Sequence, residues 1–105
     1  MKDFRRIAED FAKRLKATHE GRIERIILFG SVARGDTRED SDIDVLVVTS
    51  DPSWEFRLAL ARETNEILLR EGVYVSAKAM DPRELSEVAA TSFGRNLRRE
   101  GLQLA

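Results

Sequence analysis

Two short segments on either side of a polar loop decide how this chain is interpreted. They read Phe29-Gly30-Ser31-Val32-Ala33-Arg34-Gly35-Asp36 and Ser41-Asp42-Ile43-Asp44-Val45. An apolar run before the first segment predicts a buried strand over residues 23–29, and β-branched residues predict a second strand over residues 42–48. The chain therefore follows one strand with a glycine turn and places two carboxylates on the next strand.

The turn at Gly30 and Ser31 has the properties of a phosphate-binding site. Glycine lets the backbone approach a ligand closely, and the short helical turn predicted at residues 31–34 begins with unpaired N–H groups. The Ser31 hydroxyl can add a hydrogen bond, and Arg34 lies one turn further along, within reach of the same anion. In the alternative interpretation, Gly30 only permits a turn and Ser31 only caps a helix.

Asp42 and Asp44 are two residues apart, so on a strand their side chains emerge from the same face. Two adjacent carboxylates repel each other and are costly in an apolar strand. A divalent cation removes this repulsion, which makes the pair a candidate metal site and catalytic pair. In the alternative interpretation, both aspartates lie at a solvated strand end and contact only water.

The two halves together are more specific than either alone. Metal-assisted nucleotidyl transfer needs a metal that bridges phosphate and protein, and a site that positions the α-phosphorus for in-line displacement. A phosphate-binding turn beside a carboxylate pair can supply both. We therefore expect a nucleotide site across the first two strands.

Composition narrows the function classes further. The 105 residues predict one domain, 1–105, and 42% hydrophobic and 35% charged residues are typical of a globular chain in water. With no cysteine and one histidine, a bound metal must have oxygen ligands, which favours Mg²⁺, Mn²⁺ or Ca²⁺.

No apolar run approaches the roughly 20 residues that cross a bilayer. We see no export signal and expect a cytoplasmic protein without a membrane partner. The net charge of −1 argues against a nucleic-acid duplex as partner.

The order of the remaining elements predicts an α/β fold, a mixed sheet of three to four strands packed by helices. Pro at a first helical position after an aspartate N-cap is a helix-start signal that occurs twice. We predict three further helices, over residues 2–17, from Asp51-Pro52 to about Glu71, and from Asp81-Pro82 to about Ala90. A helical turn is predicted at residues 95–100. Two further strands are predicted at residues 73–80 and 102–104.

Several residues outside the two segments have a structural interpretation by default. His19 is predicted at the surface, where the end of the first helix favours a cation. An arginine cluster near Phe93 is predicted to be a solvated helix face, with a nucleic acid or an acidic partner as the minor alternative. For the long helix we expect a core face of Trp54, Leu58, Ala61, Ile67 and Leu68.

The two segments resemble the signature of the minimal nucleotidyltransferases in the DNA polymerase β superfamily. The tail Phe93-x-Arg95-Asn96-x-x-x-Glu100-Gly101 is also similar to that of many small members. The resemblance implies a nucleotidyltransferase fold, Mg²⁺ (or Mn²⁺) on Asp42 and Asp44, and transfer of a nucleoside monophosphate, AMP from ATP or another triphosphate. It implies a phosphate-binding set of Gly30, Ser31, Arg34 and Ser41.

The sequence departs from that family at a third carboxylate, which members commonly carry on the next core strand to activate the attacking hydroxyl. The strand reads Val73-Tyr74-Val75-Ser76-Ala77-Lys78 and contains no acid. We predict that Tyr74 occupies the place of the missing carboxylate and that Ser76 shares its face. A tyrosine is a poor base near pH 7. The base then comes from a partner or another local acid, or the chain binds nucleotide without turnover.

The resemblance also implies a partner. Minimal nucleotidyltransferases often resemble the antitoxin of a pair whose toxin is a helical HEPN-domain protein, and the small enzyme can adenylylate a tyrosine on that toxin. The chain could also neutralise such a partner by occlusion alone. A transferase that modifies antibiotics or nucleic acids is a third possibility, which we disfavour because it needs an acceptor-binding domain. A homo-oligomer is compatible with each.

Overall fold

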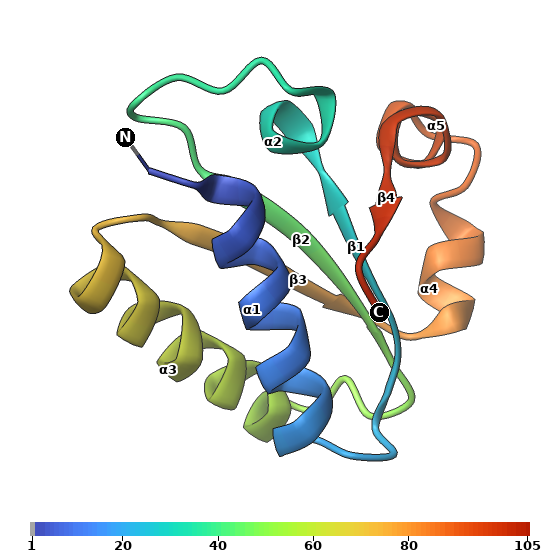
Figure 1. Cartoon of the computed structure of the whole chain (residues 1–105). Helices are drawn as coiled ribbons and strands as arrows, with labels where there is room; N and C mark the ends of the chain where they lie inside the picture. Colours follow the sequence, from blue (N-terminus) through green and yellow to red (C-terminus); the bar gives the residue numbers. More distant parts are fainter. Residues whose placement is uncertain (1) are drawn as a thin grey trace.

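A four-stranded mixed sheet forms the middle layer of the structure, a computed structural model that describes residues 2–105 (Figure 1). The strand order is β3-β2-β1-β4. β1 is antiparallel to both β2 and β4, whereas β2 and β3 are parallel. The strands are β1 (Ile23–Phe29), β2 (Ile43–Thr49), β3 (Val75–Met80) and β4 (Leu102–Gln103). This arrangement confirms the predicted mixed sheet.

Five helices pack around the sheet. α1 and α3 lie against one face, which Figure 1 shows in front, and α4 and α5 pack on the other face. α2 lies at the end of the sheet, between β1 and β2 on one side and α5 on the other. The helices are α1 (Phe4–Thr18), α2 (Gly30–Arg34), α3 (Trp54–Glu71), α4 (Pro82–Glu87) and α5 (Ser92–Glu100).

Alternating side chains of the two central strands build two separate cores. Val45 and Val47 of β2 face α1 and α3, where they join Ile26 and Leu28 of β1. The side chains between them face α4 and α5, so Leu46 packs in the smaller core. Strands covered on both faces are expected to read as continuous apolar runs, as both strands do. Asp44 shares the α4–α5 face of β2 with Leu46, and its position at the start of the strand places it at the open end of this face.

The first helix and the short fourth helix begin with caps that satisfy free backbone N–H groups. The Asp3 side chain accepts a hydrogen bond from the N–H of Arg6 at 3.1 Å. Asp81 and Glu84 form a reciprocal capping box, with Pro82 at the start of α4. The start of α4 agrees with the sequence prediction, although this helix ends at Glu87 rather than near residue 90, and α1 begins at Phe4 rather than at residue 2.

The start of α3 differs from the sequence prediction. Ser53, not Asp51, is the N-cap, and its hydroxyl accepts a hydrogen bond from the N–H of Phe56 at 3.3 Å. Asp51 instead belongs to a turn, because its N–H donates to Oγ1 of the buried Thr49 at 3.0 Å. Serine and aspartate are both favourable N-caps, and Ser53 is two residues after Asp51. Because Asp51 is part of the turn at the end of β2, Ser53 caps the helix.

The predicted core face of α3 is also wrong, apart from Ile67. Phe56, Leu60 and Ile67 are the buried side chains of this helix. Trp54, Leu58, Ala61 and Leu68 are exposed. Two stripes of α3 have helical apolar periodicity, and periodicity alone does not say which stripe contacts the sheet.

Three smaller predictions also need correction. β3 begins at Val75 rather than at residue 73, and β2 begins at Ile43, which leaves Asp42 just before the strand. His19 is not a surface residue: its side chain is only 10% exposed, lies 3.1 Å from Oε2 of Glu63 and packs edge-to-face on Phe56. Within residues 2–105, no helix has the length and apolar character needed to cross a membrane.

The orientation of α3 gives a direct stability test. Leu60→Ala removes a side chain that is buried against the sheet and should lower the free energy of unfolding by about 2–4 kcal/mol. Leu58→Ala removes the same atoms from an exposed site and should cost less than about 1 kcal/mol. Urea unfolding of dilute protein measures both values, and equal losses would contradict this orientation.

Candidate active site

The chain passes from β1 directly into α2, and Gly30 at this junction lies against Asp44. Gly30 has a φ of +74°, in the left-handed region that favours glycine. A Cβ atom at this position would collide with the Asp44 carboxylate. The sheet register explains the contact, because Phe29 is paired with Asp44 across β1 and β2. The two predicted segments therefore meet, as the sequence indicates.

Asp44 lies in an electrostatic environment that disfavours its charge. Partial burial raises the pKa of its carboxyl group, and the nearby carboxylate of Asp42 raises this pKa further. Lys78 and Arg34 oppose the shift because their positive charges stabilise the carboxylate. Asp42 is exposed, in the loop just before β2. The structure thus brings the two predicted carboxylates close enough to repel each other.

Ser31 and Arg34 flank the same junction from α2. The Ser31 hydroxyl forms no hydrogen bond with any residue in the range 2–105. The Ser31 carbonyl accepts hydrogen bonds from the N–H groups of Gly35 and Asp36, which close the short helix. The hydroxyl is therefore available to a ligand.

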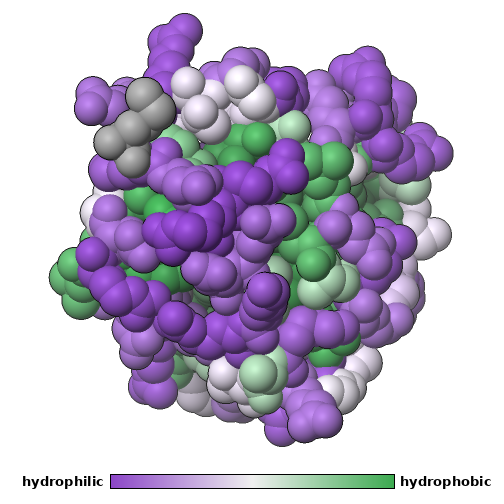
Figure 2. All heavy atoms as spheres, in the orientation of Figure 1, coloured by the Kyte–Doolittle hydropathy of each residue, from purple (hydrophilic) through white to green (hydrophobic). Residues whose placement is uncertain are grey.

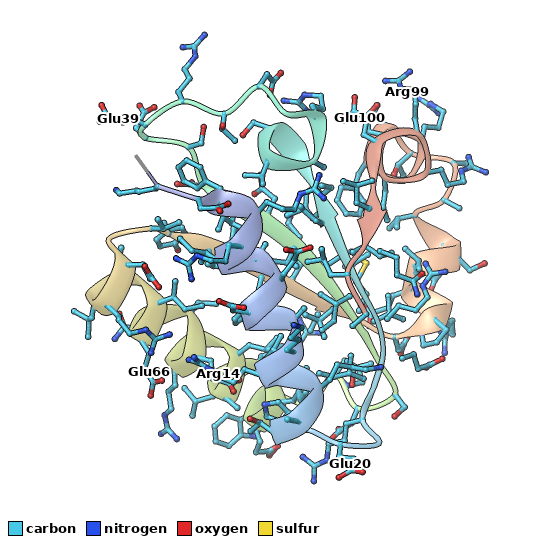
Figure 3. All side chains as sticks on the ribbon, in the orientation of Figure 1. Arg14, Glu20, Glu39, Glu66, Arg99 and Glu100 are labelled. Atoms are coloured by element: carbon cyan, nitrogen blue, oxygen red, sulfur yellow. The ribbon has the colours of Figure 1, made fainter. Side chains whose placement is uncertain are left out.

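Arg34 has two carboxylate partners of its own. Its Nε donates to Asp36 at 3.2 Å, and its Nη1 donates to Glu100 of α5 at 3.2 Å. These contacts raise the pKa of the guanidinium. Figure 3 shows Glu100 on the side of α5 that faces α2. Arg34 therefore links α2 to α5, and any contact with a phosphate would compete with these bonds.

Ser41 closes the loop between the two segments. Its Oγ accepts a hydrogen bond from the N–H of Arg38 at 2.7 Å, and its own N–H donates to the Arg38 carbonyl at 3.0 Å. This tight turn precedes Asp42 directly. Ser41 therefore has a structural role in positioning the first carboxylate, and its assignment to phosphate binding stays a prediction.

The position beside Asp44 on β3 belongs to Ser76, not to Tyr74. The parallel register pairs Asp44 with Ser76 and Ile43 with Val75. Tyr74 comes one residue before β3, where its carbonyl accepts a hydrogen bond from the N–H of Ile43 at 2.9 Å, and the residue is 55% exposed. The assignment of Tyr74 to the place of the missing carboxylate stays a prediction, and Ser76, which was predicted to share its face, is the residue paired with Asp44. No acidic residue lies on β3.

The sequence interpretation did not select Lys78 as a site residue, although its charge acts on Asp44. Lys78 is on the same face of β3 as Ser76, and its Nζ is 5.7 Å from the centre of the Phe93 ring. Phe93 in turn packs edge-to-face on Phe29, with ring centres 5.4 Å apart. Alternation along β3 could have identified Lys78, since residues 44, 76 and 78 share one face of the sheet.

The donor set fits a cation that is shared with a phosphate ligand. Among residues 2–105, no group of three or more acidic, histidine or cysteine side chains could hold a metal alone. Asp42 and Asp44 supply two carboxylates whose mutual repulsion a cation would relieve. Mg²⁺ commonly binds one or two protein carboxylates and completes its shell with substrate phosphates and water. The residues present are therefore compatible with Mg²⁺ in the presence of a nucleotide.

The sheet, the glycine junction and the carboxylate pair together define a nucleotidyltransferase fold, and a family comparison agrees. Residues 5–93 match the family model of the nucleotidyltransferase domain. Because this match spans most of the chain, the protein belongs to the nucleotidyltransferase domain family.

Two relatives from Methanocaldococcus jannaschii, both named as protein adenylyltransferases, support this assignment. The first is 39% identical over 93 residues, which cover 89% of this chain and 89% of the relative. The second is 31% identical over 71 residues, which cover 67% of this chain and 72% of the relative.

Solved structures show that the whole sheet-and-helix arrangement recurs. A chain in a toxin–antitoxin crystal structure with AMP-PNP has a TM-score of 0.67 at 23% identity, and the match covers 92% of this chain and 72% of that chain. A chain in the Shewanella oneidensis complex of a tri-AMPylated HEPN toxin with an MNT antitoxin has a TM-score of 0.60 at 21% identity, covering 95% and 71%. At these identities the likeness shows the fold.

The raised pKa of Asp44 predicts the effect of its neutralisation on stability. Protonated Asp44 stabilises the fold below the pKa of the unfolded carboxyl, about 3.9, and this contribution is lost as the pH rises through the raised pKa of the folded state. Asp44→Asn should therefore raise the Tm at pH 7 by on the order of a few degrees in EDTA. Thermal unfolding followed by circular dichroism measures the change.

Asp42→Asn is the matched control. It removes the repulsion felt by Asp44 but not the burial, which is the larger cause of the pKa shift, so its stabilising effect should be smaller. The advantage of Asp44→Asn should shrink as the pH falls toward 4. A lower Tm for Asp44→Asn at pH 7 would contradict the assignment.

Proposed function

We propose that this protein transfers AMP from ATP to a hydroxyl group of a partner protein, with Mg²⁺ bound by Asp42 and Asp44. The contact of Gly30 with the Asp44 carboxylate carries the proposal. It brings the start of α2, where backbone N–H groups are free, next to a carboxylate pair that can hold a cation. A triphosphate at this junction can contact both.

The residues of the site divide the work of binding the triphosphate. Gly30 permits close approach of the backbone, and Ser31 donates its free hydroxyl to a phosphate oxygen. Lys78 lies near enough to Asp44 to affect its pKa, so it can neutralise phosphate charge from the β3 side. Bound Mg²⁺ would supply charge neutralisation at the phosphates.

The reaction exchanges one phosphorus–oxygen bond for another. The acceptor oxygen forms a bond to the α-phosphorus, the bond from this phosphorus to the bridging oxygen breaks, and pyrophosphate leaves. The acceptor hydroxyl loses its proton. Because Ser76 stands beside Asp44 on β3, that strand offers no carboxylate to accept the proton. The base then comes from the partner or from another local acid.

The relatives suggest the class of acceptor. Both Methanocaldococcus proteins carry the name of protein adenylyltransferases, and one structural relative comes from a complex with an AMPylated HEPN toxin. We therefore propose that the acceptor is a tyrosine of a HEPN-domain toxin and that this chain is the antitoxin.

A second function is favoured by one observation. β3 carries no acidic residue, although the family resemblance implies one there, and this suits a protein that binds nucleotide weakly or without turnover. Such a protein would neutralise its partner by occlusion.

Nucleotide binding tests the site before any acceptor is known. Calorimetric titration with a non-hydrolysable ATP analogue should show binding that requires Mg²⁺. Asp42→Asn/Asp44→Asn should weaken it by at least about tenfold, because no other carboxylate of the site can replace the pair. Wild-type protein that binds no nucleotide at millimolar concentration would contradict the proposed site.

The same variant separates the two functions when the toxin is present. If transfer neutralises the toxin, the variant should still form the complex but should fail to label the toxin from α-³²P-ATP and fail to protect growth. Full protection by the variant would instead support occlusion.

Gly30→Ala should displace the Asp44 carboxylate, whereas Gly35→Ala should not. Both glycines have positive φ, 74° and 80°, so alanine should cost about 1–2 kcal/mol at either site. A Cβ at Gly35 would meet nothing within 4 Å, so this variant carries the strain without the collision. Only Gly30→Ala should lose the rise in Tm given by Mg²⁺ and the ATP analogue. Equal ligand-induced shifts in the two variants would show that the contact is unimportant.

A further inference from the structure

The outer surface of α3 carries an apolar stripe that nothing in the described residues 2–105 covers. The exposed fractions are 69% for Trp54, 41% for Leu58, 38% for Leu68 and 79% for Leu69. Ala61 is exposed between them. At about 100° per residue, these side chains lie on one side of the helix, opposite the buried side chains. The stripe runs from the first residue of α3 almost to its last.

The stripe is unusual for this molecule. The outer face of α1, the neighbouring helix, is made of charged side chains, and Figure 2 shows hydrophilic atoms along it. Hydrophobic atoms reach the surface at the margin of the same view, where Figure 1 draws the C-terminal part of α3. Single exposed apolar residues are ordinary, but several along one side of a helix mark an interaction surface.

Each edge of the apolar stripe carries one arginine and one glutamate, and the two pairs are centred on the same residue. Arg62 and Glu66 follow one edge of the stripe, and both are exposed. Neither forms an ion pair with any residue in the range 2–105. Figure 3 shows Glu66 projecting away from the body of the protein. The midpoint between Arg62 and Glu66 in the sequence is residue 64. On the other edge of the stripe, Arg57 and Glu71 also have residue 64 as their midpoint.

This symmetry identifies the occupant of the stripe. We propose that two copies of the chain form a dimer through antiparallel α3 helices, with the two-fold axis at the level of Thr64. In an antiparallel pair each edge meets the same edge of its symmetry mate. Arg62 of one copy therefore lies opposite Glu66 of the other, twice per dimer. The second pair, Arg57 with Glu71, shares the axis, although Glu71 also lies 3.7 Å from Arg6 of its own chain.

Asn65 adds a polar element at the centre of the stripe. It is exposed and lies one residue from the level of the axis, so the two Asn65 amides approach each other in the dimer. A buried pair of asparagines can hydrogen-bond to each other and specify helix register at some cost in stability. The charges at the edges and the amides at the centre therefore select one alignment. A partner of a single charge would not match edges that carry both signs.

The dimer leaves the candidate active site open. Asp44 lies on the face of the sheet that α4 and α5 partly cover, whereas α3 packs on the opposite face. Each copy would keep its own site, so the proposal is independent of nucleotide transfer and of the toxin partner.

Sedimentation velocity of the full chain, from about 1 to 500 µM, tests the proposal. We expect a monomer–dimer equilibrium that Leu69→Glu shifts to monomer. Trp54 is the only tryptophan of the chain and lies level with the exposed Tyr74 of the second copy. Its fluorescence should therefore move to shorter wavelength as the wild-type dimer forms.

Charge exchange tests the alignment. Arg62→Glu places like charges opposite each other and should weaken the dimer by about tenfold or more, and Arg62→Glu/Glu66→Arg should restore it. Lys13→Glu on the exposed face of α1 makes the same charge change and should have no effect. A chain that stays monomeric throughout, or a dimer that neither Leu69→Glu nor Arg62→Glu weakens, would overturn the proposal.

Discussion

The close approach of Gly30 to Asp44 is the constraint on which the rest of the structure depends. It requires a residue without a Cβ at a positive φ, directly after a buried strand. It also requires β1 and β2 to be antiparallel neighbours in the register that pairs Phe29 with Asp44. The apolar side chains of both strands fix that register, because a slip of one residue would exchange the two faces. The packing of the core thus determines where the carboxylate lies.

The remainder of the chain supports this junction from the other side. Glu100 of α5 accepts a hydrogen bond from Arg34 of α2, and Phe93 of the same helix packs on Phe29. β4, directly after α5, extends the sheet on β1. A segment far away in sequence therefore holds the short helix in place. Short helices have little stability of their own and depend on such contacts.

The sequence predicted the parts of the site that depend on local pattern. Gly30 at a strand end and the alternation of Asp42 and Asp44 are visible in a few residues, and the structure brings them together. Ser76 and Lys78 required the register of β3 against β2, which depends on where β3 starts. The rotation of α3 was also beyond local pattern, since both of its faces are apolar. The packing of Phe56, Leu60 and Ile67 against the sheet shows which face is buried, and periodicity alone does not encode that choice.

Within residues 2–105, the outer edge of β3 has no strand partner. Unpaired edges invite pairing with other chains, and proteins often discourage it with a lysine, a short strand or a proline nearby. β3 has six residues, carries the exposed Lys78 and is followed closely by Pro82. Lys78, whose charge lowers the pKa of Asp44, is therefore also placed to protect the edge against aggregation. A substitution of Lys78 can therefore change both the protection of this edge and the pKa of Asp44.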